Sequence, residues 1–268
     1  MRLGMVLPLE LGSESPIRGN SVSTGARALE AAGFASAWFF DSIGRGRMGI
    51  EPLIGAVAAA MVTTDLEVGT GVVQVPLRNP IELAQRVLAA QLLCSGRLIL
   101  GVGAGSTRGD FEAVGHDFDS RMETLDNSLG VMRKLWRGET VGRANLTPLP
   151  EALGGPPVVI GSWGGSKWIQ RAATEFDGWI ASGAFKGLND LEKGIRLYKE
   201  SEGKRAIITN VSINLSANEP LDHAGDMFHL NCPPSEARSR LKLLHELGFD
   251  DVVLVHKGVS AMPDLDRI

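Results

Sequence analysis

Short apolar runs alternate with segments of helical spacing along the whole chain. Several runs are continuously hydrophobic, which is typical of strands that are covered on both faces. Between the runs, apolar residues recur on one side of a helix, as Leu83, Val87 and Leu88 do. The predicted strands are Leu3–Leu9, Ala35–Asp41, Leu66–Val75, Arg97–Val102, Val158–Trp163, Gly178–Ser182, Ile207–Leu215 and Val252–His256. The predicted helices are Gly25–Gly33, Pro52–Thr63, Pro80–Cys94, Met122–Trp136, Ser166–Asp177, Asp190–Glu202 and Ser235–Leu247.

This alternation predicts an α/β protein with parallel strands, because each pair of strands is joined by a helical crossover. Eight units in 268 residues favour a (β/α)8 TIM barrel over an open doubly wound sheet. The first unit also lacks the G-x-G-x-x-G turn of an open dinucleotide-binding sheet. We therefore expect one barrel domain over residues 1–268. Only twelve residues follow His256, so the last helix is expected to be short or missing.

Composition narrows the class of protein further. Hydrophobic residues make up 44% of the chain and charged residues 22%, as in ordinary globular proteins. The net charge of −4 argues against a nucleic-acid partner. Two cysteines form no disulfide framework, and the start of the chain shows no signal-peptide pattern, so we expect a cytoplasmic protein. The longest apolar stretch, Ile54–Val62, is far shorter than a membrane span of roughly 20 residues, so no membrane partner is expected.

Glycine is over-represented, with 33 residues against a usual share of about 7%, and it gathers at the predicted strand ends. In a TIM barrel the chemistry lies at the C-terminal ends of the strands, here called the mouth. Gly69 and Gly71 near the end of the third strand indicate either a flat ligand against bare backbone or tight packing. Asp41, at the end of the second strand, is either a functional carboxylate or a cap for the next loop. His256 ends the last strand and is the one histidine that we select as a catalytic candidate.

Two further segments carry specific patterns. Asn79 and Pro80 read as the N-cap and first residue of a helix, whereas Arg78 is free to meet an anionic group or a carboxylate. In the segment Ile160–Lys167, a strand is followed by Gly164, Gly165 and a helix start at Ser166. Bare N–H groups at a helix N-terminus bind phosphate, and we favour this over a simple tight turn. No histidines or cysteines have metal-ligand spacing, so no metal site is expected.

The segments Leu77–Ala84 and Leu92–Gly105 resemble the bacterial luciferase-like monooxygenase family, whose pattern is R-N-P, a helix, L-S-G-G-R and L-G-V-G. The stretches Arg121–Gly138, Gly164–Ser166 and Asp177–Trp179 also fit this family. The resemblance covers the chain from about Leu3 to Ser182, and the C-terminal third only loosely. These motifs are specific to the superfamily and not to one reaction.

The resemblance implies a barrel that binds FMN or the deazaflavin coenzyme F420 at its mouth, with F420 slightly favoured. A non-proline cis peptide is implied at Gly71–Val72, where backbone N–H groups would support the reduced ring. The ring contacts are implied at Asp41 and Ser42, with Gln74 and Ser162 in the same cofactor set, and the phosphate contacts at Gly164, Gly165 and Ser166. Asp41 or His256 would manage a proton.

Some positions depart from the family pattern. Ser42 stands where many members have histidine, and Ser106 stands where sugar-phosphate dehydrogenases have an acid, which argues against that particular dehydrogenation. The stretch between Gly138 and Pro156 is shorter than in most relatives, so we expect a slightly trimmed barrel with an open pocket.

The first hypothesis is an oxidoreductase or monooxygenase acting on a small organic substrate by hydride transfer or oxygenation. The alternatives are a non-catalytic flavin- or deazaflavin-binding protein, or a flavin-free barrel isomerase or lyase acting on a phosphorylated metabolite. The candidate partners are a small-molecule substrate, a separate reductase that supplies reduced cofactor, and a second copy of the chain in a homodimer.

Overall fold

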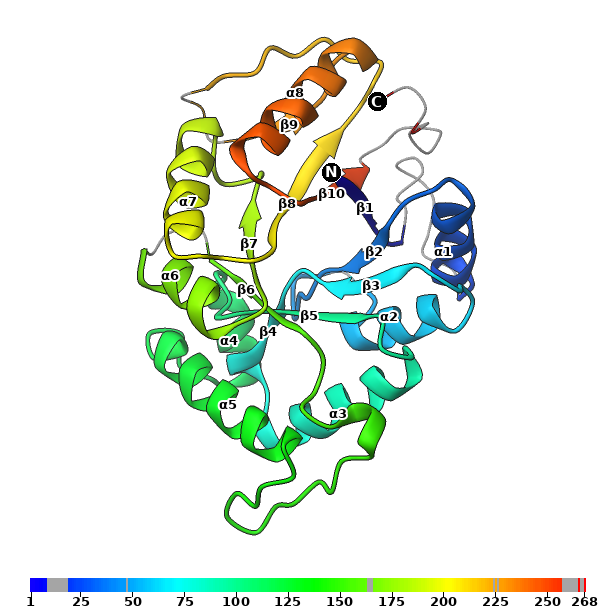
Figure 1. Cartoon of the computed structure of the whole chain (residues 1–268). Helices are drawn as coiled ribbons and strands as arrows, with labels where there is room; N and C mark the ends of the chain where they lie inside the picture. The colour runs from blue at the N-terminus through cyan, green and yellow to red at the C-terminus, as the bar shows by residue number, and fades with distance from the viewer. Residues whose placement is uncertain are drawn as a thin grey trace.

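The computed structural model describes residues 1–8, 19–46, 48–162, 166–223, 225, 227–256, 265 and 268 (Figure 1). The strands are β1 (Arg2–Val6), β2 (Ser36–Phe39), β3 (Glu67–Thr70), β4 (Val73–Gln74), β5 (Leu98–Gly103), β6 (Val158–Gly161), β7 (Gly178–Ser182), β8 (Ala206–Ile213), β9 (His229–Leu230) and β10 (Asp251–His256). The helices are α1 (Ser21–Ala31), α2 (Pro52–Ala60), α3 (Pro80–Leu93), α4 (Arg108–Val114), α5 (Arg121–Trp136), α6 (Ser166–Glu175), α7 (Leu188–Glu200) and α8 (Pro234–Leu247). Two 3-10 helices are η1 (Val75–Leu77) and η2 (Pro150–Ala152).

The sheet closes into a parallel barrel, which confirms the predicted (β/α)8 fold. The strands follow one another in the order β10-β1-β2-β3-β5-β6-β7-β8, and β10 also pairs with β8. The eight predicted strands are all present, and the third is divided into β3 and β4. The division falls at a non-proline cis peptide between Gly71 and Val72, the position that the family resemblance implies.

Two short elements, α4 and β9, were not predicted from the sequence. The helix α4 has seven residues, too few to show helical periodicity. The strand β9 has two residues, too few to show a strand pattern, and lies between the predicted strand Ile207–Leu215 and the predicted helix Ser235–Leu247. The expected short or missing last helix falls on residues 257–264 and 266–267, which lie outside the described residues.

The expectation that the shortened stretch opens the pocket was wrong. Residues 139–157 connect the end of α5 to the start of β6, so they lie at the N-terminal end of the strands, opposite the mouth. There they pack against the framework, since Gly154 N–H donates to the Trp136 carbonyl at 2.9 Å. The indole of Trp136 in turn donates to the Ala84 carbonyl of α3 at 3.0 Å. This stretch therefore stabilises the outer helices.

The hydrophobic core has two layers. The barrel interior holds Trp38, Ile99, Val159, Ile180, Ile207 and Val253. A larger layer lies between the strands and the surrounding helices and includes Met132 and Leu135 of α5. Since the strands are covered on both faces, their apolar runs are continuous, as the sequence pattern indicated. Within the described ranges, no helix is both long enough and apolar enough to cross a bilayer.

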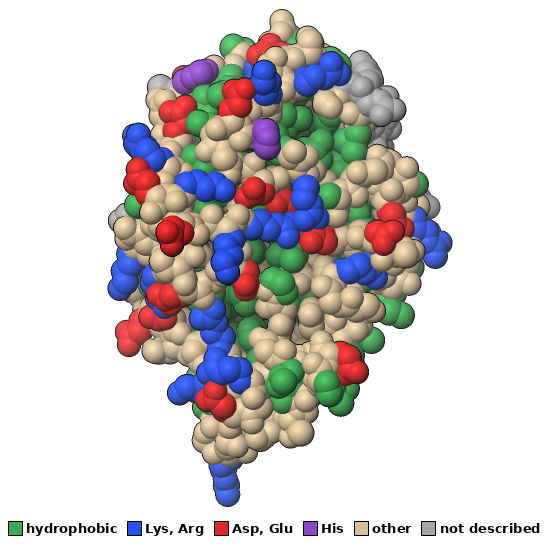
Figure 2. Space-filling model, in the orientation of Figure 1, with side chains coloured by type: hydrophobic (Ala, Val, Ile, Leu, Met, Phe, Trp, Pro, Cys, Tyr) green, Lys and Arg blue, Asp and Glu red, His purple; other side chains and the backbone are tan. Residues whose placement is uncertain are grey.

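Ion pairs close the N-terminal end of the barrel. Arg205, just before β8, holds the buried carboxylate of Asp251 with two hydrogen bonds of 2.7 and 2.8 Å. It also contacts Glu67 of β3 at 2.9 Å. Burial alone would raise the pKa of the Glu67 carboxyl, but hydrogen bonds from Arg205 and Arg2 hold this pKa below its usual value. Figure 2 shows acidic and basic side chains intermixed over the visible face, with a group of both signs near its centre.

We predict that Gly101→Ala in β5 destabilises the barrel. A Cβ atom at this position would lie 1.8 Å from the backbone oxygen of Thr70. Backbone cannot give way as a flexible side chain does, so we expect a loss of about 1–3 kcal/mol or more in the free energy of unfolding.

Urea denaturation measures the effect of Gly101→Ala. The matched control is Gly130→Ala on the exposed face of α5, where a Cβ meets nothing within 4 Å. That control should be neutral or stabilising by roughly 0.5–1 kcal/mol, because alanine favours a helix interior. Equal stability of the two variants would contradict the close approach of β3 and β5.

Candidate functional site

A cavity of about 730 Å³ lies at the C-terminal ends of the strands. This volume is in the range of small-molecule and cofactor sites. The structure brings seven of the sequence-predicted site residues together in its lining: Asp41, Ser42, Gly71, Val72, Gln74, Ser162 and His256. Gly164 and Gly165 lie outside the described residues. Ser166 is the first residue of α6, close along the chain to Ser162 at the cavity wall.

One wall of the cavity is built from backbone and the side chain of Val72. A Cβ on Gly103 or Gly161 would lie 2.8 or 2.7 Å from a methyl group of Val72, so these glycines make room for it. Gly69 likewise makes room for the Trp38 ring, at 2.6 Å from its own hypothetical Cβ. Tight packing therefore explains these three glycines. Gly71 lines the cavity itself, beside the apolar side chain of Val72.

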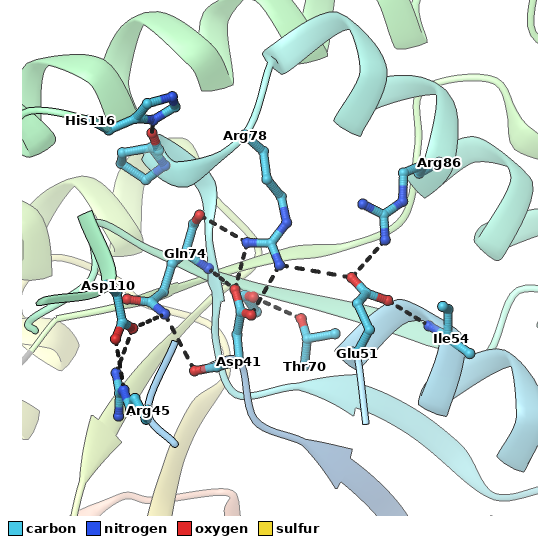
Figure 3. A network of polar contacts seen from close by, with 12 residues as sticks. Asp41, Arg45, Glu51, Ile54, Thr70, Gln74, Arg78, Arg86, Asp110 and His116 are labelled. Atoms are coloured by element: carbon cyan, nitrogen blue, oxygen red, sulfur yellow. Dashed lines mark hydrogen bonds and ion pairs between the residues drawn. The ribbon is translucent and has the colours of Figure 1, made fainter. Parts of the chain in front are cut away.

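Asp41 is held at the centre of a polar network beside this wall (Figure 3). Its Oδ2 accepts hydrogen bonds from the Gln74 N–H at 2.8 Å and from Nη1 of Arg78 at 2.6 Å. Its Oδ1 accepts from Nη2 of Arg78 at 3.0 Å. Only 3% of the Asp41 side chain and 10% of the Arg78 side chain is exposed. The sequence left either an anionic group or a carboxylate as the partner of Arg78, and the structure shows that the partner is the carboxylate of Asp41.

The local sequence fixes the course of the chain around Arg78. Asn79 caps α3, because its side-chain oxygen accepts hydrogen bonds from the N–H groups of Ile81 and Glu82, and Pro80 is the first helical residue, as predicted. The cap fixes the chain direction at Arg78, which follows η1 directly. Asp41 in turn fixes the backbone at Gln74. These contacts anchor the segment that forms the cavity wall.

The network continues through Gln74 to Asp110 of α4, as Figure 3 shows. Nε2 of Gln74 donates to Asp110 at 2.9 Å, and Arg45 binds the same carboxylate with two hydrogen bonds of 2.8 and 2.7 Å. Burial alone would raise the pKa of the Asp110 carboxyl, but the hydrogen bonds from Arg45 and Gln74 outweigh it and hold this pKa below its usual value. The pair ties the loop after β2 to α4 at the edge of the cavity.

His256, the second catalytic candidate, lies at the end of β10 and lines the cavity with 5% of its surface exposed. Ser106 lines the cavity after β5, at the position where the family resemblance implies an acid in sugar-phosphate dehydrogenases. The catalytic assignments of Asp41 and His256 stay predictions. Among the described residues, no group of three or more His, Cys, Asp and Glu side chains is arranged to hold a metal ion.

Sequence reasoning missed several residues of the site. Arg45 lines the cavity and is bound by the buried Asp110 behind it, but the two are far apart in sequence and nothing in the local pattern pairs them. Thr209 and Asn210 stand inside the apolar run of the seventh predicted strand, and this polar interruption was a signal that could have found them. Phe185 follows β7 and lines the cavity although 55% of its surface is exposed.

A sequence model of luciferase-like monooxygenases matches residues 1–218 of the chain. The chain belongs to this family. An uncharacterised protein of Mycobacterium tuberculosis is 26% identical over 209 residues, which are 67% of this chain and 71% of that protein. The F420-dependent glucose-6-phosphate dehydrogenase of Mycobacterium avium is 31% identical over 194 residues, 65% of this chain and 54% of that enzyme. Limonene 1,2-monooxygenase of Rhodococcus erythropolis is 33% identical over 115 residues, 42% of this chain and 30% of that enzyme.

Solved structures of this luciferase-like fold cover nearly the whole chain. A monooxygenase from Streptomyces bottropensis superimposes with a TM-score of 0.81 at 18% identity, covering 100% of this chain and 95% of its own. A coenzyme F420-dependent tetrahydromethanopterin reductase from Methanopyrus kandleri superimposes with a TM-score of 0.75 at 14% identity, covering 96% and 93%. At these identities the likeness shows the shared barrel fold.

We predict that Asp110→Asn destabilises the protein at pH 7 by about 1.5–3 kcal/mol, because hydrogen bonds between charged groups are lost. The folded pKa of Asp110 is depressed, so its stabilising contribution is complete above the unfolded value of about 3.9 and is lost as the pH falls through the folded value.

Urea unfolding of wild type and Asp110→Asn at pH 7 and below pH 4 tests this, and the difference in stability should shrink at the lower pH. Asp119→Asn is the control, because that carboxylate is 73% exposed in its pair with Arg108 and should contribute little. A difference that does not change with pH would contradict the assignment to the Asp110–Arg45 pair.

Proposed function

We propose that the chain is an oxidoreductase that binds a deazaflavin or flavin cofactor in the cavity and acts on a small organic substrate there. The observation that carries this proposal is the one cavity at the mouth in which seven predicted site residues meet, in a member of the luciferase-like family. In a TIM barrel, ligands bind at the C-terminal ends of the strands. The protein would position the substrate against the cofactor and provide the electrostatic environment, and the cofactor would carry out the chemistry.

The residues of the cavity fit a planar cofactor ring. The wall at Gly71 and Val72 would give the ring an apolar surface, since the glycines at 103 and 161 leave room for the Val72 side chain. At its edge, the buried Oε1 of Gln74 has no hydrogen-bond partner in the described part of the chain, which suits a ligand with N–H groups. When bound, the cofactor would accept or donate a hydride. We assign the ring contacts to Asp41, Ser42, Gly71, Val72, Gln74 and Ser162.

Of the two cofactors we propose F420 over FMN. The support is the similarity at 31% identity to an F420-dependent sugar-phosphate dehydrogenase over 65% of the chain. We assign the cofactor phosphate to Gly164, Gly165 and Ser166 at the start of α6, because N–H groups at a helix N-terminus bind anions.

We propose distinct roles for the two catalytic candidates. Asp41 orients the cavity wall through its contacts with Gln74 and Arg78. Its carboxylate would also exchange a proton with a ligand that reaches it. His256, at the end of β10 in the cavity lining, would exchange a proton with the substrate. We also propose that residues 1–268 form a single barrel domain and that a second copy of the chain is its partner. A separate reductase would supply the reduced cofactor that the reaction consumes.

A fluorescence titration with F420 and with FMN, each oxidised and reduced, tests the proposal. Trp168 lines the cavity and should report binding. Tight binding of F420 alone is the expected result. Tight binding of FMN alone would overturn the choice of cofactor, and binding of neither would overturn the oxidoreductase proposal in favour of a flavin-free barrel acting on a phosphorylated metabolite.

We predict that Gly165→Asp weakens cofactor binding by at least a hundred-fold, because an added carboxylate would repel the phosphate and occupy its place. The matched control is Gly130→Asp, which adds the same charge on the exposed face of α5 where nothing lies within 4 Å. The same titration, with thermal melting as a check of folding, measures both. Unchanged affinity in Gly165→Asp would remove the phosphate assignment.

A further inference from the structure

Strand β8 is irregular where it reaches the cavity. Ile208 pairs with Val252 of β10, but Val211 pairs with Leu254, so two residues of β8 face one residue of β10. These two residues are Thr209 and Asn210. Asn210 has a φ of +59°, which is uncommon for a residue other than glycine. A β-bulge of this kind re-aims side chains, and both consecutive residues line the cavity.

The bulge brings these side chains to Ser182 on the neighbouring strand β7, which is in register with Thr209. Nδ2 of Asn210 donates to the hydroxyl oxygens of Ser182 and Thr209, at 3.2 Å in each case. The Thr209 hydroxyl donates to the Ala181 carbonyl at 3.2 Å. We call Ser182, Thr209 and Asn210 the β7–β8 polar cluster.

The hydrogen bonds of this cluster leave one donor and one acceptor for a ligand. The Ser182 oxygen accepts from Asn210 and from the Ala184 N–H at 3.4 Å, so its own hydrogen remains to be donated. Within the described chain, no group donates to Oδ1 of Asn210, and this oxygen remains to accept. A hydroxyl group of a ligand could accept a hydrogen bond from Ser182 and donate one to Oδ1 of Asn210. A carbonyl oxygen of a ligand could accept a hydrogen bond from Ser182.

The surroundings of the cluster are uncharged and largely apolar. Ile180, Ala181, Phe185 and Val255 line the cavity around it. The arginines of the cavity belong to other elements and have partners of their own. Arg45 pairs with Asp110, and Nη1 of Arg121 donates to the Phe118 carbonyl at 2.9 Å. Of the described lining residues on β7, β8 and β10, none is Lys, Arg, Asp or Glu, and His256 is the one titratable group.

We propose that the β7–β8 polar cluster binds the hydroxyl or carbonyl oxygen of an uncharged small organic substrate whose apolar body lies against Ile180, Phe185 and Val255. The inference rests on the proposed function, because it takes the wall at Gly71 and Val72 as the cofactor side of the same cavity. A phosphorylated or carboxylated substrate would find neutral donors here in place of a cation, which disfavours it.

Ligand-observed NMR with cyclohexanol and cyclohexanone as probes tests the proposal on the full chain, with and without F420 or FMN. Ser182→Ala removes the donor, and Asn210→Gly removes the acceptor while keeping a residue that adopts positive φ without strain. We expect each variant to weaken binding of cyclohexanol about five- to ten-fold. The control is Ser212→Ala, a serine of the same strand that does not line the cavity, and it should leave the affinity unchanged.

The outcomes separate this inference from the proposed function. Cofactor affinity, measured in the separate fluorescence titration, should stay within two-fold in Ser182→Ala and Asn210→Gly. If these variants weaken the cofactor and not the probes, the cluster belongs to the cofactor site and the inference is overturned while the proposed function stands. No binding of either probe to the wild type, or tighter binding of cyclohexyl phosphate that depends on the same residues, would also overturn it.

Discussion

The buried ion pair between Asp41 and Arg78 is the contact on which the mouth of the barrel depends. It joins the loop after β2 to the segment between η1 and α3, and Asp41 also binds the backbone of Gln74. A buried charge without its partner is costly, so the three positions are locked together. The chain between β3 and β4 is held in place from this side, while Val72 fills the space left by Gly103 and Gly161 on the other. The cavity wall follows from these two constraints.

The two ends of the barrel use charge in different ways. At the N-terminal end, Arg205 pairs with Glu67 and Asp251 and contributes to the closure of the sheet. At the mouth, Arg78 and Arg45 hold carboxylates that shape a cavity. This division matches the general rule that the N-terminal face of a TIM barrel serves stability and the C-terminal face serves function.

The cavity itself has two unlike halves. The half formed after β2, β3 and β5 is a backbone wall beside a charged network, which suits a large planar cofactor. The half formed by β7, β8 and β10 carries neutral hydrogen-bonding groups among apolar side chains, which suits a small uncharged molecule. Under the proposed function, the first half would hold the cofactor and the second half would select the substrate.

Much of this architecture can be predicted from local patterns in the sequence. Continuous apolar runs separated by amphipathic segments predicted all eight barrel strands, because strands covered on both faces need no alternation. Asn79 and Pro80 predicted the start of α3, since capping is a contact between residues three positions apart or fewer. The glycines near the strand ends indicated close approach, although the sequence alone did not separate packing from a ligand.

The tertiary structure decided everything that depends on partners distant in the chain. Arg78 had a carboxylate or an anion as alternatives, and only the closed barrel brings Asp41 to it across 37 positions. Asp110 joins Arg45 across 65 positions through a helix too short to predict. The polar interruption at Thr209 and Asn210 is visible in the sequence, but the bulge there is a shift in the pairing of β8 with β10, which only the closed sheet shows. Local sequence determines elements because their contacts are near in the chain, whereas the cavity is made of contacts that exist only after the sheet has closed.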